Sequence, residues 1–234
     1  MIFTTIMPGW TQTKDSDQLG MAIEYFQSGK YHEALNIFCK LETKHELNPR
    51  FKAYMGVCFY YEWDYANAAA YLDKALPQLS KLAPHERSFY YYACAESHFE
   101  LQEYGKALPL YNEMITLCYD NEKADAYYKI GFIYMFQQQW TDALDNFQSA
   151  LVYYTQFRPD QKSRIAQIRN MINGCVLEIE RRKPPQAKPP CPPVGGTIHI
   201  LNVGTHAMRP QAAEVSLIFC TFAHGKTKYT FWSG

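Results

Sequence analysis

The segment YHEALNIF, residues Tyr31–Phe38, decides the fold because its pattern returns three more times along the chain. The later copies are YANAAAYL at 65–72, YGKALPLY at 104–111 and WTDALDNF at 140–147. Each copy has an aromatic residue first, an alanine fourth and a large apolar residue eighth. The four alanines, Ala34, Ala68, Ala107 and Ala143, are 34, 39 and 36 residues apart. A repeat period in this range is typical of a helix–turn–helix solenoid.

The conserved spacing within each copy predicts how the two helices of a unit pack. A small residue lies twelve positions before each alanine: Ala22, Gly56, Ala95 and Gly131. We expect this residue to let the second helix approach closely, with the alanine in the matching contact, where a bulkier side chain would cost about 1–3 kcal/mol. The aromatic residue is predicted to pack beneath the turn. Predicted turns are 28–30, 62–64, 101–103 and 137–139, which are short enough to make the two helices antiparallel neighbours.

These landmarks resemble those of the tetratricopeptide repeat (TPR) family. Four units are predicted, at 15–48, 49–87, 88–123 and 124–159, after an N-terminal segment at 1–14. The resemblance implies an all-α fold, a right-handed helix–turn–helix solenoid that presents surfaces to partners. Two features depart from the family pattern. Gln18 and Lys52 stand where a bulky residue is usual, and the 39-residue spacing predicts a longer helix or loop around Pro77–Glu86.

The chain beyond the fourth unit divides into three further predicted segments. Residues 160–182 form an amphipathic stretch, which predicts a capping helix over the last unit. Its apolar positions are Ile165, Ile168, Ile172, Val176 and Ile179. Residues 183–196 are rich in proline and predict a stiff, extended linker. The tail, 197–234, is compatible with two short strands or with disorder, and the sequence does not choose between them.

Composition excludes several classes of protein. The formal net charge is zero, and no dense basic patch indicates binding to nucleic acid. No apolar run is long enough to span a membrane, and the N-terminus lacks the basic region of a secretory signal. Seven cysteines without a C-x-x-C pair favour reduced thiols. We therefore expect a cytoplasmic protein.

Motifs of the familiar enzyme families are not found in this sequence. Cys94 and His98 are four residues apart and share a helical face, whereas Glu96 points away from them. We expect His98 to be a packing residue. No cluster has the spacing of metal ligands along the chain. The sequence thus predicts neither catalytic residues nor a cofactor or metal, and it indicates that the protein is not an enzyme.

The resemblance implies a concave groove lined by the first helix of each unit. Carried over by repeat position, the predicted partner-binding residues are Phe26, Arg50, Tyr60, Tyr61, Phe89, Tyr92, Glu96, Phe99, Tyr128, Phe132, Met135 and Phe136. Phe132 is as compatible with packing as with exposure. Tyrosine suits an interface because its hydroxyl stays hydrated. Arg50 and Lys129 are the only positive charges at these sites, which argues against the carboxylate clamp of chaperone-binding relatives.

We therefore expect a protein-binding scaffold or chaperone. Its partner would be an apolar or amphipathic segment held by aromatic anchors, with Glu96, Glu100 and Asp125 orienting any basic flank. One alternative is a type III secretion chaperone for translocator proteins, a family similar to this chain in its repeats and in Ala93–Leu101. Another is a self-assembling structural protein whose tail, at Val215–Phe222, occupies the groove of a neighbouring copy.

Overall fold

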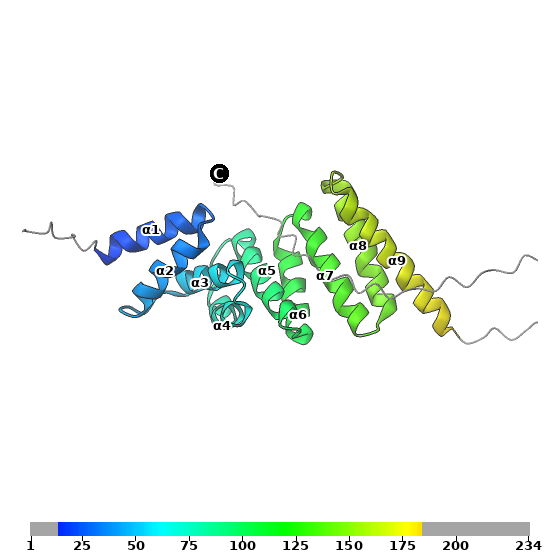
Figure 1. The fold of residues 1–234 in the computed structure, drawn as a ribbon, viewed down its shortest axis with the longest axis horizontal. Coiled ribbons are helices and arrows are strands. Elements are labelled where there is room, and N and C mark those ends of the chain that lie inside the picture. The colour runs from blue at the N-terminus through cyan, green and yellow to red at the C-terminus, as the bar shows by residue number, and fades with distance from the viewer. Residues whose placement is uncertain (1–13, 184–234) are drawn as a thin grey trace, which may run out of the picture. The chain divides into compact units, whose positions relative to one another are not determined.

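A computed structural model describes residues 14–183, and this range contains nine α-helices and two short 3-10 helices (Figure 1). The α-helices are α1 Asp15–Gln27, α2 Tyr31–Glu42, α3 Pro49–Tyr61, α4 Tyr65–Ala75, α5 Pro84–Glu100, α6 Tyr104–Leu117, α7 Lys123–Phe136, α8 Trp140–Phe157 and α9 Lys162–Arg182. The 3-10 helices are η1 Leu76–Gln78 and η2 Asp120–Glu122. The predictions for 1–13 and for the linker and tail beyond Lys183 lie outside the described residues.

The helices pack as antiparallel pairs that follow one another in a row (Figure 1). The most extensive packing is within the pairs α7 with α8, α5 with α6 and α3 with α4, followed by α8 with α9 and then α1 with α2, and each pair also contacts the next. This confirms the predicted all-α, TPR-like solenoid. Its core is built from the landmarks, because the four alanines and the large apolar residues four positions after them are fully buried.

The small residue of the first helix is where two helices approach most closely. A Cβ atom added to Gly56 would lie 2.6 Å from Cγ of Leu72, and one added to Gly131 would lie 2.7 Å from the ring of Phe147. Real Cβ atoms are essentially never this close to another heavy atom. The second helix therefore packs directly on the backbone of the first, as the spacing predicted.

All four turns inside the pairs share one conformation. Their middle residues, Gly29, Trp63, Gln102 and Gln138, have φ values of 74°, 69°, 61° and 59°. In each turn the following N–H donates to the carbonyl five residues earlier, as from Lys30 to Tyr25 at 2.8 Å. This is the Schellman motif that ends helices with a left-handed residue. Only the first unit uses glycine there, so residue type signals the left-handed position in that turn alone.

In the first and third units, the aromatic residue that opens the second helix does more than pack beneath its own turn. Tyr31 contacts Phe26 of its own unit, with ring centroids 5.7 Å apart, and also stacks on Tyr61 of the next unit at 3.9 Å. Tyr104 likewise lies 5.4 Å from Phe136. These rings therefore connect consecutive units, a role that the sequence analysis missed.

The second and third units differ from the predicted boundaries. α5 begins at Pro84, so the boundary predicted between 87 and 88 lies inside a helix. The long spacing is taken up by η1 and the loop after it, as expected, and by an additional turn at the start of α5. Proline at the first position of a helix is favourable because its missing N–H would have no partner there. Pro49 and Pro84 thus start α3 and α5.

The last helix, α9, covers α8 with part of the predicted apolar face (Figure 1). Ile165, Ile168 and Cys175 are buried. Val176, predicted on this face, is exposed, because the buried stripe passes through Cys175 instead. The five cysteines between residues 14 and 183 are free thiols. Within this range no helix is both long enough and apolar enough to cross a membrane.

Candidate protein-binding surface

The structure separates the predicted groove residues into a buried and an accessible group. Phe26, Glu96, Tyr128 and Phe132 are buried. Tyr60, Tyr61, Phe89, Tyr92, Phe99 and Met135 are half-buried, and Arg50 and Phe136 are exposed. The first group cannot offer its side chains to a partner without unfolding, so only the second remains a candidate surface.

Tyr128 and Phe132 belong to the core of the fourth unit, and the expected exposure of Tyr128 is wrong. The Phe132 ring meets the Phe147 ring edge-on with centroids 5.3 Å apart, and Tyr128 meets Phe132 at 4.8 Å. The guanidinium of Arg164 on α9 covers the Tyr128 ring at 4.6 Å. Phe26 is similarly covered, because it stacks on Tyr54 at 4.2 Å. In both cases the helix two places further along the solenoid supplies the cover, which a single repeat does not reveal.

Glu96 is also buried, and the role predicted for it is wrong. Nζ of Lys129 lies 3.0 Å from Oε2 of Glu96 and 3.6 Å from Oε1 of Glu100. The hydroxyl of Tyr111 donates to the same Glu96 carboxylate. Burial alone would lower the pKa of Lys129, but the two carboxylates outweigh it and the pKa is raised. Lys129 and Glu96 therefore neutralise each other between two units.

Asp125 and Arg50 also form ion pairs with other residues of the protein. Arg158 donates to Asp125 at 2.6 Å, and the Tyr154 hydroxyl donates to the other oxygen of that carboxylate. Nε of Arg50 donates to Glu86 at 2.8 Å across the second and third units. The charges predicted to orient a partner's flank are thus used inside the protein. This leaves the accessible part of the surface mainly aromatic.

An aromatic row follows the turns of the second to fourth units. We define it as Tyr60, Tyr61, Tyr65, Phe99, Tyr104 and Phe136, which come from the ends of α3, α5 and α7 and the starts of α4 and α6. Phe99 and Phe136 have ring centroids 6.4 Å apart, and Tyr60 and Tyr65 are 6.1 Å apart. Burial, together with nearby Glu100 and Glu96, raises the pKa of Tyr65 to about 12.

Phe136 is the most accessible member of the aromatic row, with 47% of its surface exposed. It ends α7 beside the turn to α8 and contacts Phe99, Tyr104 and Phe132. An exposed ring held by other rings presents a rigid apolar face at a low cost in entropy. Tyr65 and Tyr104 were not among the predicted groove residues, although their place as the opening aromatics of second helices could have indicated them.

The structure also brings together a polar cluster that the sequence analysis missed. Cys94 and His98 of α5 share one face, as predicted, and both are buried. Asp73 of α4 joins them, with its Oδ1 atom 3.4 Å from Sγ of Cys94 and 3.1 Å from Nε2 of His98. These three side chains are donors of a kind that bind a metal ion. Asp73 is distant in the sequence, so spacing along the chain could not reveal the set.

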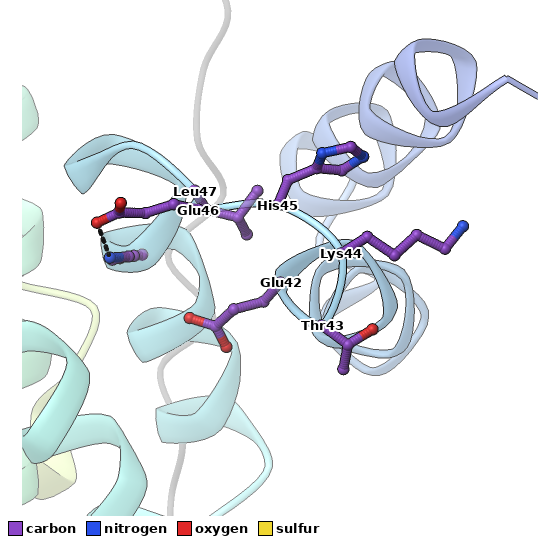
Figure 2. Close-up of a pocket in the computed structure, with 7 residues that line it drawn as sticks. Glu42, Thr43, Lys44, His45, Glu46 and Leu47 are labelled. Atoms are coloured by element: carbon purple, nitrogen blue, oxygen red, sulfur yellow. Dashed lines mark ion pairs between the residues drawn. The ribbon is translucent and has the colours of Figure 1, made fainter.

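A pocket of about 400 Å³ lies away from the aromatic row, at the loop between α2 and α3 (Figure 2). It is lined by Glu42, Thr43, Lys44, His45, Glu46, Leu47 and Lys52. Figure 2 shows Glu46 paired with Lys52, and the nitrogen and oxygen are 3.6 Å apart. Lys44 and His45 are both paired with Asp15 of α1. The pocket is therefore a solvated junction of exposed ion pairs.

Comparison with known proteins supports the fold. No family model matches this sequence, and no curated protein is similar to it. The chain is similar in structure to MamA of strain AMB-1, with a TM-score of 0.58 and 14% identity over 71% of this chain and 83% of that one. It is also similar to TPR-like kinesin light chain repeats of Podosopora anserina, with a TM-score of 0.51 and 11% identity over 71% and 87% of the two chains.

At such low identity these likenesses show the fold alone. The repeated landmarks, the paired helices and the structural neighbours agree, and the chain has a TPR-like repeat fold.

Proposed function

We propose that this protein binds an apolar or amphipathic segment of a protein partner along the aromatic row. The observation that carries the proposal is the row itself. In it Phe99, Tyr104 and Phe136 of the third and fourth units contact one another, and Phe136 is exposed. Tyr60 and Tyr65 of the second unit contact each other at the turn before them. Aromatic residues are enriched where interfaces draw most of their binding energy. A partner would remove these rings from water, with apolar side chains placed along the turns of the solenoid.

Electrostatics supports an apolar ligand in preference to a charged one. Arg50, Lys129 and Arg158, which lie among the candidate residues or beside them, are bound to Glu86, Glu96 and Asp125. A partner's carboxylate would have to displace these existing pairs, and breaking a buried pair leaves an uncompensated charge. We therefore propose shape and aromatic contact, not charge, as the source of affinity.

The experiment compares the aromatic row with exposed apolar residues elsewhere. Tagged full-length protein is purified from its source cells as wild type, as Tyr60→Ala with Phe136→Ala, and as Val152→Ala with Leu177→Ala. Val152 on α8 and Leu177 on α9 are 58% and 63% exposed and serve as the matched control. Circular dichroism establishes that all three are folded.

We expect a partner that remains with the wild type and the control but is lost from the aromatic variant. Removing one anchor residue from an interface costs about 2 kcal/mol, or roughly thirty-fold in affinity. If the captured partner is a second copy of this chain, self-assembly is the function, and a translocator protein would support the secretion-chaperone alternative. Retention of every partner by the folded aromatic variant would overturn the proposed surface.

A further inference from the structure

The cluster of Asp73, Cys94 and His98 has the geometry of a metal site. Its three ligand atoms, a carboxylate oxygen, Sγ and Nε2, all lie within 4.8 Å of one another. Zinc bonds of about 2.0–2.3 Å in a tetrahedron place neighbouring ligands about 3.3–3.8 Å apart. The observed separations of 3.4 Å from Cys94 and 3.1 Å from His98 to Asp73 are close to these values. Small side-chain movements would therefore complete three bonds to one ion.

The helices fix two of these side chains in advance. Cys94 and His98 lie four residues apart on α5, so they project from one face one turn apart. Both are buried, and Ala93 and Ala95 beside them are buried too. Asp73 lies on α4 of the preceding unit, and its side chain remains 46% exposed. An ion could therefore enter from the Asp73 side and bind to a preformed pair on α5.

Glu103 supplies the support that a metal-binding histidine needs. Its Oε2 atom lies 2.6 Å from Nδ1 of His98, on the opposite side of the imidazole from Asp73. Metal-bound histidines commonly donate their second nitrogen to a carboxylate, which fixes the ring and its tautomer. Nζ of Lys106 pairs with Glu103 at 3.0 Å and holds it in position. The arrangement leaves Nε2 directed at Asp73 and Cys94.

We propose that Asp73, Cys94 and His98 bind one zinc-class divalent cation, with solvent in the fourth position and Glu103 as the positioning residue. A thiolate, an imidazole and a carboxylate together suit Zn²⁺ or Co²⁺ better than Mg²⁺ or Ca²⁺, which prefer oxygen alone. The ion would tie the second unit to the third, since its ligands come from α4 and α5.

Binding is balanced by the release of a proton. The S–H bond of Cys94 breaks as the metal–sulfur bond forms, and the thiol proton leaves to the buffer. We therefore expect the thiol proton of Cys94 to be released for each ion bound, and an affinity that rises with pH.

The test uses full-length reduced protein and Co²⁺ as a spectroscopic probe. We expect one equivalent of Co²⁺ to produce a thiolate-to-cobalt charge-transfer band and the visible bands of a tetrahedral site, and Zn²⁺ to remove them. Cys94→Ser should abolish the charge-transfer band. Cys118→Ser, which removes a half-buried thiol outside the cluster, should leave it unchanged. Glu103→Gln should weaken binding by about 10–100-fold while the band keeps its shape.

Two further measurements separate a metal site from a purely structural ion-pair cluster. Asp73→Asn tests the site even if Cys94→Ser does not fold, because nearly half of the Asp73 side chain is exposed. It should weaken Co²⁺ binding by at least the same factor as Glu103→Gln. Zn²⁺ should raise the melting temperature of the wild type but not that of Asp73→Asn. Folded wild type without a charge-transfer band, or a band that persists in Cys94→Ser, would overturn the proposal.

Discussion

Gly131 gives the most direct test of how the two helices of a unit pack. Alanine at this position would place a Cβ atom 2.7 Å from Cδ1 and Cε1 of Phe147, against the 3.4–4 Å of ordinary contact. Phe147 is fully buried, so its ring has little room to move. The ring or the helix must shift by several tenths of an ångström. Overpacking of this kind costs about 1–3 kcal/mol, and alanine returns about 1 kcal/mol through its higher helix propensity.

Gly174 in α9 is the matched control. It also lies inside a helix, but an added Cβ would meet nothing within 4 Å. Gly174→Ala should therefore stabilise the protein by up to about 1 kcal/mol. Gly131→Ala should lower the free energy of unfolding by up to about 2 kcal/mol, as measured by urea denaturation of the full chain. A Gly131→Ala variant more stable than the wild type would refute the reasoning. It would mean that the Phe147 ring moves to make room for the added Cβ atom, so that alanine is accommodated as it is at Ala22 and Ala95 in the first and third units.

Three further predictions follow from the turns, the buried charges and the tyrosines. Gln138→Gly should raise the free energy of unfolding by about 0.5–1 kcal/mol because Gln138 has a positive φ. Gln137 has a φ of −82°, so Gln137→Gly should lower the free energy of unfolding. Denaturant midpoints measure both changes, and equal effects would contradict the turn geometry. Lys129→Met should lower the free energy of unfolding by about 3–5 kcal/mol because it leaves Glu96 buried without its partner. Adding Glu96→Gln to this variant should recover part of the lost stability. A Lys129→Met variant as stable as the wild type would show that the ion pair does not stabilise the protein. Burial, and then Glu96, raise the pKa of Tyr111 well above 10. The neutral Tyr111 side chain therefore stabilises the fold fully below pH 10, and above pH 10 the free energy of unfolding falls by at most about 1.4 kcal/mol per pH unit. In urea titrations the free energy of unfolding of Tyr111→Phe should fall less steeply from pH 10 to 11 than that of the wild type.

The sequence was sufficient to predict the fold because packing is repeated in it. The same helix–helix contact occurs four times. Each copy is made by an alanine, the small residue before it and the large apolar residue after it. Four copies in the same order make the pattern recognisable in the sequence. The positions of the turns were predicted correctly, but their left-handed residues were recognisable only at Gly29. Trp63, Gln102 and Gln138 adopt the same conformation because the helices on either side impose it, and residue type does not signal this.

The surface was less predictable because exposure depends on the next unit. Tyr60 and Tyr128 both looked like groove tyrosines, but Arg164 of α9 covers Tyr128 and no repeat position indicated this. Glu96 occupies a repeat position that predicts partner recognition, but Lys129, 33 residues later in the sequence, lies beside it and forms an ion pair with it. In the same way Asp73 meets His98 only because two helices from neighbouring units pack together. Contacts between units are long-range in sequence, and no local pattern predicts them.

Site-specific photo-crosslinking tests the central claim most directly. A photoreactive phenylalanine analogue replaces Phe136 in one full-length variant and Val152, which is outside the aromatic row and similarly exposed, in another. The account predicts that irradiation in source cells links a protein to position 136 and not to position 152, and that Tyr60→Ala in the same chain reduces the yield. Equal cross-linking at both positions, or cross-linking at 152 alone, would contradict the proposal that partners bind along the aromatic row.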